Sequence, residues 1–272
     1  MSYYAIGVYR EPEFSPGKVE ADAAILDEAL AQLAGEGFVT QTFAPGEFAE
    51  RGVGRADVVL AMCQGEPALR RLAEVERSGA RAINSALSIR NCYRDLLAAG
   101  LARAGVPAPA GALIRSDAPL DIRALPGVDL SLPVFVKRGD LHALNAGDVQ
   151  RAHGRMHLQA VLAQFAARGI RTVYVQQECA GTVVKFYGVD GGYFSARAES
   201  GEMCETALRD LSSAAARAAR ALGLQAWGGD AVISEAGFEI IDFNDWPSYS
   251  RVRGEAARAI ARRAVALMSR GG

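Results

Sequence analysis

Near its C-terminal end the chain contains Trp227-Gly228-Gly229-Asp230-Ala231-Val232-Ile233, then Ser234-Glu235-Ala236-Gly237, then Phe238-Glu239-Ile240-Ile241-Asp242-Phe243-Asn244-Asp245-Trp246-Pro247-Ser248. Two short apolar runs separated by a glycine-containing gap are typical of a β-hairpin. A loop of residues 235–237, with Gly237 in the left-handed conformation, pairs Asp230 with Asp242. Because side chains alternate between the two faces of a strand, Asn244 lies on the same face as Asp242.

These three polar side chains predict a metal site. Two carboxylates that face each other on neighbouring strands repel, and a divalent cation between them reverses that interaction. Mg²⁺ accepts carboxylate and amide oxygens and keeps water and phosphate oxygens as its other ligands. The alternative is a surface hairpin whose polar side chains only meet water. A register slip of one residue would also move Asp242 to the other face and remove the site.

Composition excludes several classes of function. The chain has 272 residues and a formal net charge of −1, so no global field attracts it to nucleic acid or anionic lipid. No apolar run approaches the ~20 residues of a membrane helix, and the first residues lack the basic and apolar segments of a signal peptide. We expect reduced thiols and a cytoplasmic location, because the four cysteines show no CxxC or metal-binding spacing; they are Cys63, Cys92, Cys179 and Cys204.

The first third of the chain alternates strands with helices. Apolar periodicity predicts strands over residues 3–9, 38–43, 57–62 and 81–84, and helices over 18–34 and 68–77. The run 57–62 is continuously apolar, as in a strand that is covered on both faces. This order predicts a small α/β domain with a mainly parallel sheet. The sequence alone assigns no chemistry to that domain.

A boundary follows at residues 105–109, because the two prolines there cannot continue a helix. Beyond it the pattern predicts strands over 112–114, 132–137, 172–178, 182–189 and 193–197, and helices over 158–168, 205–222 and 255–268. The strands 172–178 and 182–189 are expected to pair as a hairpin through residues 179–181. Residues 138–148 predict a polar loop that contains Gly139 and Gly147.

Six segments, in this order, resemble motifs of the ATP-grasp superfamily, in the branch that contains RimK-like carboxylate–amine ligases and the inositol phosphate kinases. They are Ile83-Asn84-Ser85, Val106-Pro107-Ala108-Pro109, Val134-Phe135-Val136-Lys137, Gln177-Glu178-Cys179, Val184-Lys185-Phe186-Tyr187-Gly188-Val189 and Ile241-Asp242-Phe243-Asn244-Asp245-Trp246-Pro247. The resemblance covers nearly the whole chain. It implies an α/β (α+β) ATP-grasp fold with an N-terminal parallel-sheet domain (1–90), a small central α+β subdomain (91–175) and a C-terminal antiparallel-sheet subdomain with the metal site (176–272).

The resemblance also implies which cations bind ATP. Lys137, at a strand end beside the polar loop, resembles the lysine that holds the α- and β-phosphates, and an ordinary surface lysine is the alternative. Lys185 lies inside an apolar strand, where an unpaired ammonium is costly, and a phosphate or carboxylate partner would offset that cost. The chain has only three lysines, and the third is Lys18.

The nucleotide base and the metal have their own candidates. Gln177, Glu178 and Cys179 resemble the hinge whose backbone binds adenine, with Glu178 a candidate ribose ligand. Asp230, Asp242 and Asn244 resemble the Mg²⁺ ligands. The ligand set of the resemblance therefore coincides with the one that the hairpin pattern predicts.

Two further candidates have equally plausible structural interpretations. Arg197 resembles a basic residue near the γ-phosphate or acyl phosphate, and a solvent-exposed strand arginine is the alternative. His142 lies in a loop with fewer glycines than the phosphate-covering loop of the family, where backbone N–H groups approach the phosphates. It is either a contact to nucleotide or substrate, or a plain loop histidine.

The activity that the resemblance implies is ATP-dependent carboxylate–amine ligation through an acyl phosphate, with a small-molecule carboxylic acid and an amine or peptide as partners. The alternatives are a small-molecule kinase of the same fold, favoured by the form of residues 242–247, and a non-catalytic nucleotide-binding protein. Ser248, Arg251 and Arg253 are candidate substrate contacts, since arginine suits a carboxylate. Homodimers are common in the family.

Overall fold

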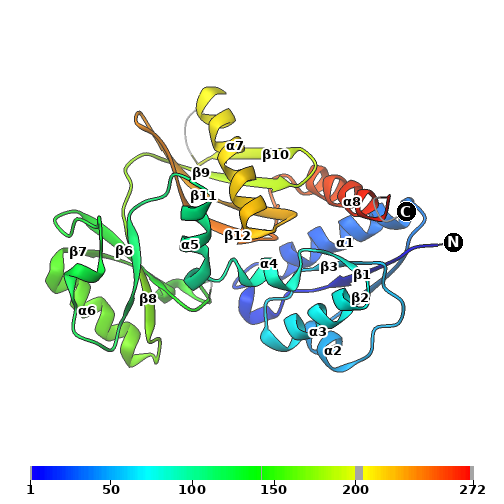
Figure 1. Ribbon diagram of the computed structural model, residues 1–272, viewed down its shortest axis with the longest axis horizontal. Coiled ribbons are helices and arrows are strands. Elements are labelled where there is room, and N and C mark those ends of the chain that lie inside the picture. The colour runs from blue at the N-terminus through cyan, green and yellow to red at the C-terminus, as the bar shows by residue number, and fades with distance from the viewer. Residues whose placement is uncertain (1, 142, 200–204, 270–272) are drawn as a thin grey trace.

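The computed structural model describes residues 2–141, 143–199 and 205–269, which form three four-stranded sheets with helices packed on them (Figure 1). The first sheet follows the N-terminus, the second takes up the middle of the chain and the third follows it. This mixed α/β architecture, with one parallel and two antiparallel sheets, confirms the predicted fold class.

The first sheet is parallel throughout, with the order β2-β1-β3-β4. Its strands are β1 (Tyr4–Val8), β2 (Val39–Phe43), β3 (Val58–Ala61) and β4 (Arg81–Ile83). Helices α1 (Val19–Gly35), α2 (Pro45–Glu50) and α3 (Glu66–Arg77) connect them, and α4 (Ala86–Arg90) follows. All residues of β3 are buried, because helices cover both faces of a parallel sheet. The predicted parallel sheet is confirmed.

The second sheet is antiparallel, with the order β5-β8-β6-β7. It consists of β5 (Gly111–Arg115), β6 (Pro133–Arg138), β7 (Val149–His153) and β8 (Thr172–Gln177), and α6 (Gly154–Ala167) covers one face. The apolar pattern did not predict β7. This edge strand buries only Ala152, so burial imposes no alternation on its sequence.

The third sheet is also antiparallel, with the order β10-β9-β11-β12. Its strands are β9 (Thr182–Val189), β10 (Tyr193–Ala198), β11 (Ala226–Ser234) and β12 (Gly237–Asp245). Helix α7 (Glu205–Leu222) and helix α5 (Arg94–Arg103) pack on one face over an aromatic cluster of Phe186, Trp227 and Phe243.

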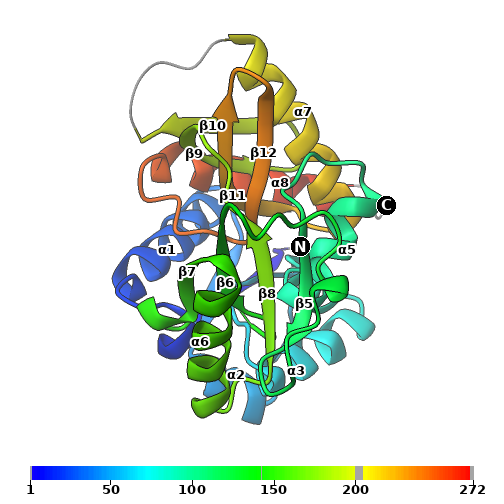
Figure 2. The same cartoon turned by 90° about the vertical axis from the view of Figure 1, so that its left-hand side faces the viewer.

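The predicted hairpin between residues 172–178 and 182–189 is wrong. Strand β8 lies between β5 and β6, whereas β9 lies between β10 and β11. Both edges of each strand are therefore occupied, and residues 178–181 connect two different sheets (Figure 2). The connection passes closely along β11, since a Cβ atom at Gly181 would collide with the carbonyl oxygen of Ile233.

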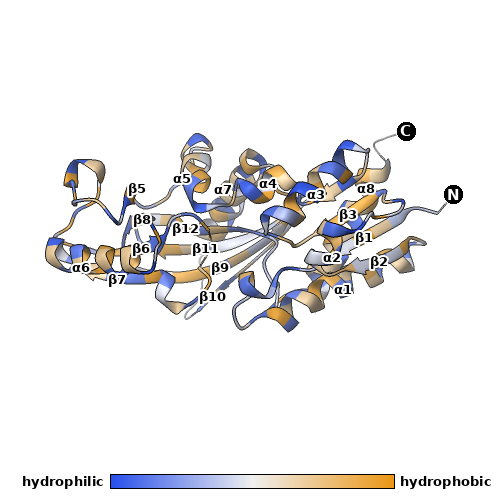
Figure 3. Ribbon diagram, turned by 90° about the horizontal axis from the view of Figure 1, so that it is seen from below, coloured by the Kyte–Doolittle hydropathy of each residue, from blue (hydrophilic) through white to orange (hydrophobic). Residues whose placement is uncertain are grey.

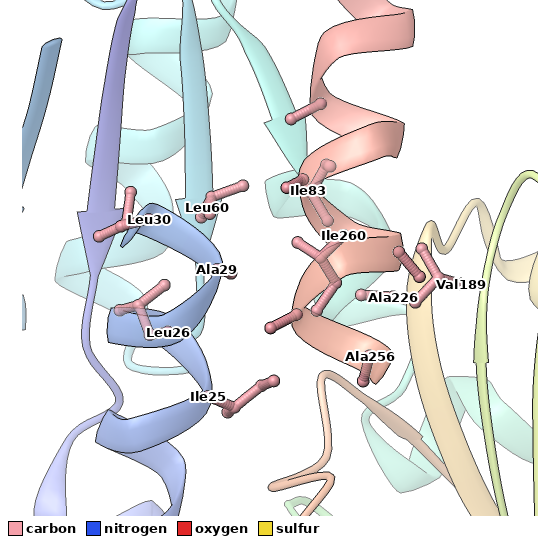
Figure 4. Packing of buried hydrophobic residues seen from close by; sticks show 14 of the residues in the cluster. Ile25, Leu26, Ala29, Leu30, Leu60, Ile83, Val189, Ala226, Ala256 and Ile260 are labelled. Carbon is pink, nitrogen blue, oxygen red and sulfur yellow. The ribbon is translucent and has the colours of Figure 1, made fainter. Parts of the chain in front are cut away.

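Helix α8 (Arg253–Ser269) returns to the N-terminal part of the molecule. Its buried face, which includes Ala256 and Ile260, packs against α1 and joins one hydrophobic cluster with residues of the first and third sheets (Figure 4). Both α1 and α8 carry hydrophobic and hydrophilic residues on different sides, as expected of helices that cover a core (Figure 3). No helix in the described ranges is long and apolar enough to cross a membrane.

Candidate functional site

The hairpin of β11 and β12 pairs Asp230 with Asp242, as the sequence predicts, but by a different route. Ser234 pairs with Gly237, so the loop has two residues rather than three, and Gly237 has a φ of 125°. A β-bulge at Ile241 then shifts the register by one residue between Asp230 and Ala231. The shorter loop and the extra residue compensate each other, and the two carboxylates end up on facing positions.

Charged residues form a row across the third sheet. Arg197 on β10 pairs with Lys185 on β9, Lys185 with Asp230 on β11, and Asp230 with Asp242 on β12. Lys185 Nζ lies 2.8 Å from Asp230 Oδ1, and burial raises the pKa of Asp230 although Lys185 opposes the shift. Arg94 of α5 places Nη1 3.9 Å from Asp242 Oδ1. Each of the two carboxylates thus has a cation beside it, Lys185 next to Asp230 and Arg94 next to Asp242.

Glycines on β11 allow the neighbouring chain segments to come close to this row. A Cβ atom at Gly229 would collide with the backbone oxygen of Asp242, and one at Gly228 would lie 2.6 Å from Pro247 Cγ. Asn244 pairs with Gly228, two residues from Asp242 on the same strand, so it shares the face of Asp242. The two glycines before Asp230 are therefore required for steric reasons, because a side chain at either position would collide with its neighbours.

The row opens into a cavity of about 460 Å³. Residues of the second and third sheets, of α5 and of the segments that follow β1 and β3 line it, among them Arg10, Lys18, Gln64, Lys137, Lys185, Asp230, Asp242, Asn244, Asp245 and Ser248. The three predicted metal ligands and both predicted phosphate-binding lysines thus meet at one cavity. Arg197 is exposed at the edge strand and does not line this cavity, so its role stays a prediction.

The donor set fits magnesium by its chemistry. Two carboxylates and one amide supply only oxygen ligands, and Mg²⁺ prefers such ligands in small number with waters completing the octahedron. Within the described ranges no three His, Cys, Asp or Glu side chains are grouped to hold a metal ion, and the predicted set contains only two carboxylates. The role of Asp230, Asp242 and Asn244 as ligands stays a prediction.

Lys137 connects the second and third sheets. Its ammonium is buried and donates to the backbone oxygen of Ile241 at 2.9 Å, and Gln176 Nε2 donates to the same oxygen at 3.4 Å. Burial lowers the pKa of Lys137 to about 8. Ile241 is the bulge residue of β12, and a bulge leaves its extra residue outside the strand ladder. The bulge therefore provides the acceptor through which β6 and β8 contact β12.

A second cavity, of about 290 Å³, adjoins the first. Arg94, Ile241 and Asp242 line both cavities, and the second extends along apolar residues of α5 and residues 106–111 to Tyr174 and Gln176. The bonds to Ile241 lie where the two spaces meet. A molecule that lay along both cavities would have to displace them.

The predicted hinge lies where the chain passes from the second sheet to the third. The backbone N–H groups of Gln177 and Glu178 donate to Ala110 and Pro133, and Glu178 pairs with Arg151 at 2.7 Å. Cys179 is half-buried, and burial raises the pKa of its thiol to about 12. These three residues do not line the 460 Å³ cavity, and an adenine contact through them stays a prediction. His142 lies outside the described residues.

The polar loop after β6 is held at its base by one buried carboxylate. Asp148 accepts hydrogen bonds from the Leu144 N–H at 2.8 Å and from Arg168, and lies 3.7 Å from Arg138 Nη1. Burial raises the pKa of Asp148, but these donors outweigh burial and the net pKa is lowered. Ala143 of this loop lines the cavity.

The sequence prediction missed the residues that follow strands of the first sheet and line the cavity. Arg10 follows β1 and donates to Asp22 and to the backbone oxygen of Trp246, and Gln64 follows β3 and donates to Asp245 at 2.8 Å. Burial raises the pKa of Asp245 to about 6. A signal was present, because polar residues at the carboxyl ends of parallel strands mark the ligand edge of an open α/β sheet.

The three candidate substrate contacts lie in different places. Ser248 lines the cavity, in a turn whose neighbours Trp246 and Tyr249 have positive φ values of 38° and 48°. Arg251 is exposed and Arg253 begins α8, and neither lines the cavity. Only Ser248 is placed where it could contact a molecule beside Asn244.

No protein-family model and no curated protein sequence matches the chain. Solved structures do match. The chain is similar to D-alanine–D-alanine ligase from Bacillus anthracis, with TM-scores of 0.74 for the ATP complex and 0.75 for a second structure, at 13% and 12% identity over 100% of both chains. It is also similar to the VanG D-Ala:D-Ser ligase from Enterococcus faecalis, with a TM-score of 0.71 and 13% identity over 98% of this chain and 99% of that one. The chain therefore has the ATP-grasp fold over its whole length.

Proposed function

We propose that this protein is an ATP-dependent carboxylate–amine ligase that forms an amide bond through an acyl phosphate. The observation that carries the proposal is the row Lys185–Asp230–Asp242, which opens into the same cavity as Asn244, Lys137 and Arg94. The solved structures named above are of ligases that join D-alanine to D-alanine or D-serine.

Asp230, Asp242 and Asn244 would hold Mg²⁺. When bound, the ion supplies positive charge that neutralises phosphate oxygens and favours their transfer. Lys185 is the cation next to Asp230 in this site. It is paired with Asp230 at 2.8 Å, and a competing cation on Asp230 would free its ammonium for a phosphate or carboxylate of the substrates.

Lys137 and Arg94 approach from the second sheet and from α5. Both are buried, and the cost of burying a charge is offset when an anion binds beside it. With a pKa of about 8, Lys137 is mostly protonated at neutral pH and can exchange the Ile241 oxygen for an ATP phosphate. The exchange would release the contact between the two sheets where ATP has to enter.

The chemistry needs no covalent group of the protein. An oxygen of the substrate carboxylate attacks the γ-phosphorus, the bond to the β-phosphate oxygen breaks, and ADP leaves. The amine nitrogen then attacks the acyl carbon, loses a proton, and phosphate leaves as the amide forms. Lys137, Lys185 and Arg94 would act by positioning the reactants and stabilising the charge that develops on the phosphate oxygens.

The cellular setting is part of the proposal. We infer a cytoplasmic protein from the free thiols Cys63, Cys92 and Cys179, since free cysteines are usual in reducing compartments. A homodimer stays a prediction.

The test is ADP release from Mg·ATP with a panel of carboxylic acids, each with and without amines and with hydroxylamine as a trap. Turnover that requires an acid and yields a hydroxamate supports the ligase. ADP formed only with hydroxyl compounds, without a trapped product, contradicts the ligase and supports a kinase of the same fold. Binding of ATP without ADP release across the panel supports a nucleotide-binding protein without turnover.

A further inference from the structure

We propose that the acid substrate carries a second anionic group, and that Lys18 binds this group in a subsite on the N-terminal wall of the cavity. The inference rests on the proposed function, because it describes the substrate of the same site. It concerns the part of the substrate that lies away from the row on the third sheet.

The use of lysine in this chain points to Lys18. Only three of the 30 lysine and arginine residues are lysines, so most positions that need a positive charge have arginine. All three lysines, Lys18, Lys137 and Lys185, line the same cavity although they come from three different parts of the fold. An ammonium is a compact donor with free rotation, whereas a guanidinium is a planar fork, so the two bind anions differently. Lys18 thus lines the same cavity as the two lysines that we assign to ATP.

The charge partners of the cavity separate Lys18 from the other cations. Arg10 pairs with Asp22, Lys185 with Asp230, and Arg94 lies beside Asp242. Lys137 donates to the Ile241 oxygen. Lys18 uses its backbone, with its N–H donating to Ser15 and its carbonyl oxygen accepting from Asp22. Its ammonium has no hydrogen-bond or ion-pair partner among the described residues, so this charge is available to a ligand.

The carboxylates near Lys18 have partners other than its ammonium. The nearby carboxylate of Asp22 is already compensated, because one of its oxygens accepts from both Arg10 and Ser15. Glu11 accepts from the backbone N–H groups of Gln64 and Gly65. Lys18 is exposed and lines the cavity, so its ammonium can meet an anionic group of a ligand.

The position of Lys18 separates its ligand group from the reacting one. Lys18 directly precedes α1 of the N-terminal domain, whereas the predicted phosphate and metal ligands come from the second and third sheets. A substrate whose carboxylate meets ATP at the third sheet would present its far end to Lys18. A dicarboxylate has the required chemistry, and a monocarboxylate does not.

The experiment measures binding rather than turnover. Wild type, Lys18→Met, Lys18→Arg and Arg209→Met are titrated by calorimetry with succinate, glutarate and adipate, and with the monoamide of each acid. Mg²⁺ and a non-hydrolysable ATP analogue are present. Arg209 is an exposed cation on α7, so its replacement is the control for the loss of one positive charge outside the cavity.

We expect wild type and Arg209→Met to bind one of the diacids at least about tenfold more tightly than its monoamide, the usual effect of a charge-assisted hydrogen bond. Lys18→Met should bind both forms equally and Lys18→Arg should keep part of the preference. Equal binding of diacid and monoamide by wild type, no binding of any diacid, or an unchanged preference in Lys18→Met would overturn the subsite. Lys18-dependent binding of a diacid without ADP release would support the subsite and contradict the ligase. Hydroxamate formed from monoacids alone would support the ligase and contradict the subsite.

Discussion

Asp230 has a charged neighbour on each adjacent strand, Lys185 on one side and Asp242 on the other. The ion pair with Lys185 offsets part of the cost of burying the carboxylate, yet the pKa of Asp230 stays raised because burial is the larger effect. Burial makes the charged form of Asp230 less stable in the fold, so this carboxylate lowers the stability of the protein. This is the expected pattern for a residue whose charge serves binding or catalysis.

Asp230→Asn separates the role of this residue in activity from its effect on stability. We expect ADP release to fall by at least about 100-fold, as when a main electrostatic stabiliser is removed. The thermal midpoint of the free protein should stay the same or rise, since the amide avoids both burial of a charge and repulsion from Asp242. Asp210→Asn on the exposed side of α7 is the matched control and should change neither quantity. A large loss of stability in Asp230→Asn would show a structural role instead.

Lys137 gives a prediction with a defined pH dependence. The native protein releases this proton at a pKa of about 8, and the unfolded chain at its ordinary value of 10.5, because burial disfavours the charged form. Between these values the unfolded state binds more protons, so this group's contribution to stability rises with pH. Lys137→Met should unfold with a free energy about 1–3 kcal/mol higher at pH 7, after the lost bond to Ile241 is allowed for.

The stability gain of Lys137→Met should shrink as the pH rises from 7 to 10. ADP release by this variant should be nearly abolished. Urea unfolding of wild type and variant at several pH values measures the difference. Lys18→Met is the control, because Lys18 is exposed and its removal should leave the free energy of unfolding unchanged at every pH. A stability gap that does not depend on pH would contradict the assigned pKa.

At the scale of elements, the loop over residues 139–148 depends on the buried carboxylate of Asp148. Its side chain has no exposed area and holds Arg138 at one end of the loop, the Leu144 N–H within it and Arg168 at the end of α6. Gly139 begins the loop where a Cβ atom would lie 2.8 Å from the Thr172 backbone. The loop is thus anchored at its base while its tip carries Ala143 to the cavity.

Asp148→Asn should lower the free energy of unfolding by about 3 kcal/mol, since removing one partner of a buried ion pair leaves the others uncompensated. The pKa of Asp148 is lowered in the fold, so its stabilisation is present above the ordinary value of 3.8 and is lost as the pH falls further. The gap between wild type and variant should therefore narrow below pH 4. Limited proteolysis at neutral pH should cut the loop of the variant faster.

Asp140→Asn is the control for this anchor. Asp140 pairs with the same Arg138 at 2.6 Å but is half-exposed, and surface ion pairs contribute less than about 1 kcal/mol. If both variants lose the same stability, the buried position of Asp148 is not the cause.

At the scale of the whole molecule, the cavity exists because three sheets are held against one another. Asn84 is buried at the end of β4, donates to the backbone oxygen of Ala226 at 2.7 Å and accepts from the N–H groups of Gln225 and Ala226. Helix α8 completes the contact from the other side by packing on α1 (Figure 4). These contacts fix Arg10, Lys18 and Gln64 relative to the third sheet.

Asn84→Ala should lower the free energy of unfolding by about 3 kcal/mol, because two buried backbone groups and one partly buried one lose their partner. Asn91→Ala is the matched control: Asn91 donates one bond to Leu222 and should cost about 1 kcal/mol. Urea unfolding followed by tryptophan fluorescence measures both. If Asn84→Ala unfolds at the same urea concentration as Asn91→Ala, the contact at Asn84 does not hold the two sheets together.

The sequence by itself determined the local structure and much of the site. Apolar periodicity and turn residues predicted the parallel sheet, most strands and helices, and the pairing of Asp230 with Asp242, because these depend on neighbours within a few residues. The pairing was right although the loop was wrong, since a bulge at Ile241 compensated for the missing loop residue. A bulge has no sequence signal as strong as that of a turn.

Only the tertiary structure decided which strands pair and which distant residues meet. Strands β8 and β9 look like a hairpin locally, but each finds two other partners, because pairing depends on every free edge in the chain. The contacts of Arg10 with Trp246, Gln64 with Asp245 and Lys137 with Ile241 join residues more than one hundred positions apart. Such contacts follow from how three sheets pack together, and local pattern carries no information about that packing.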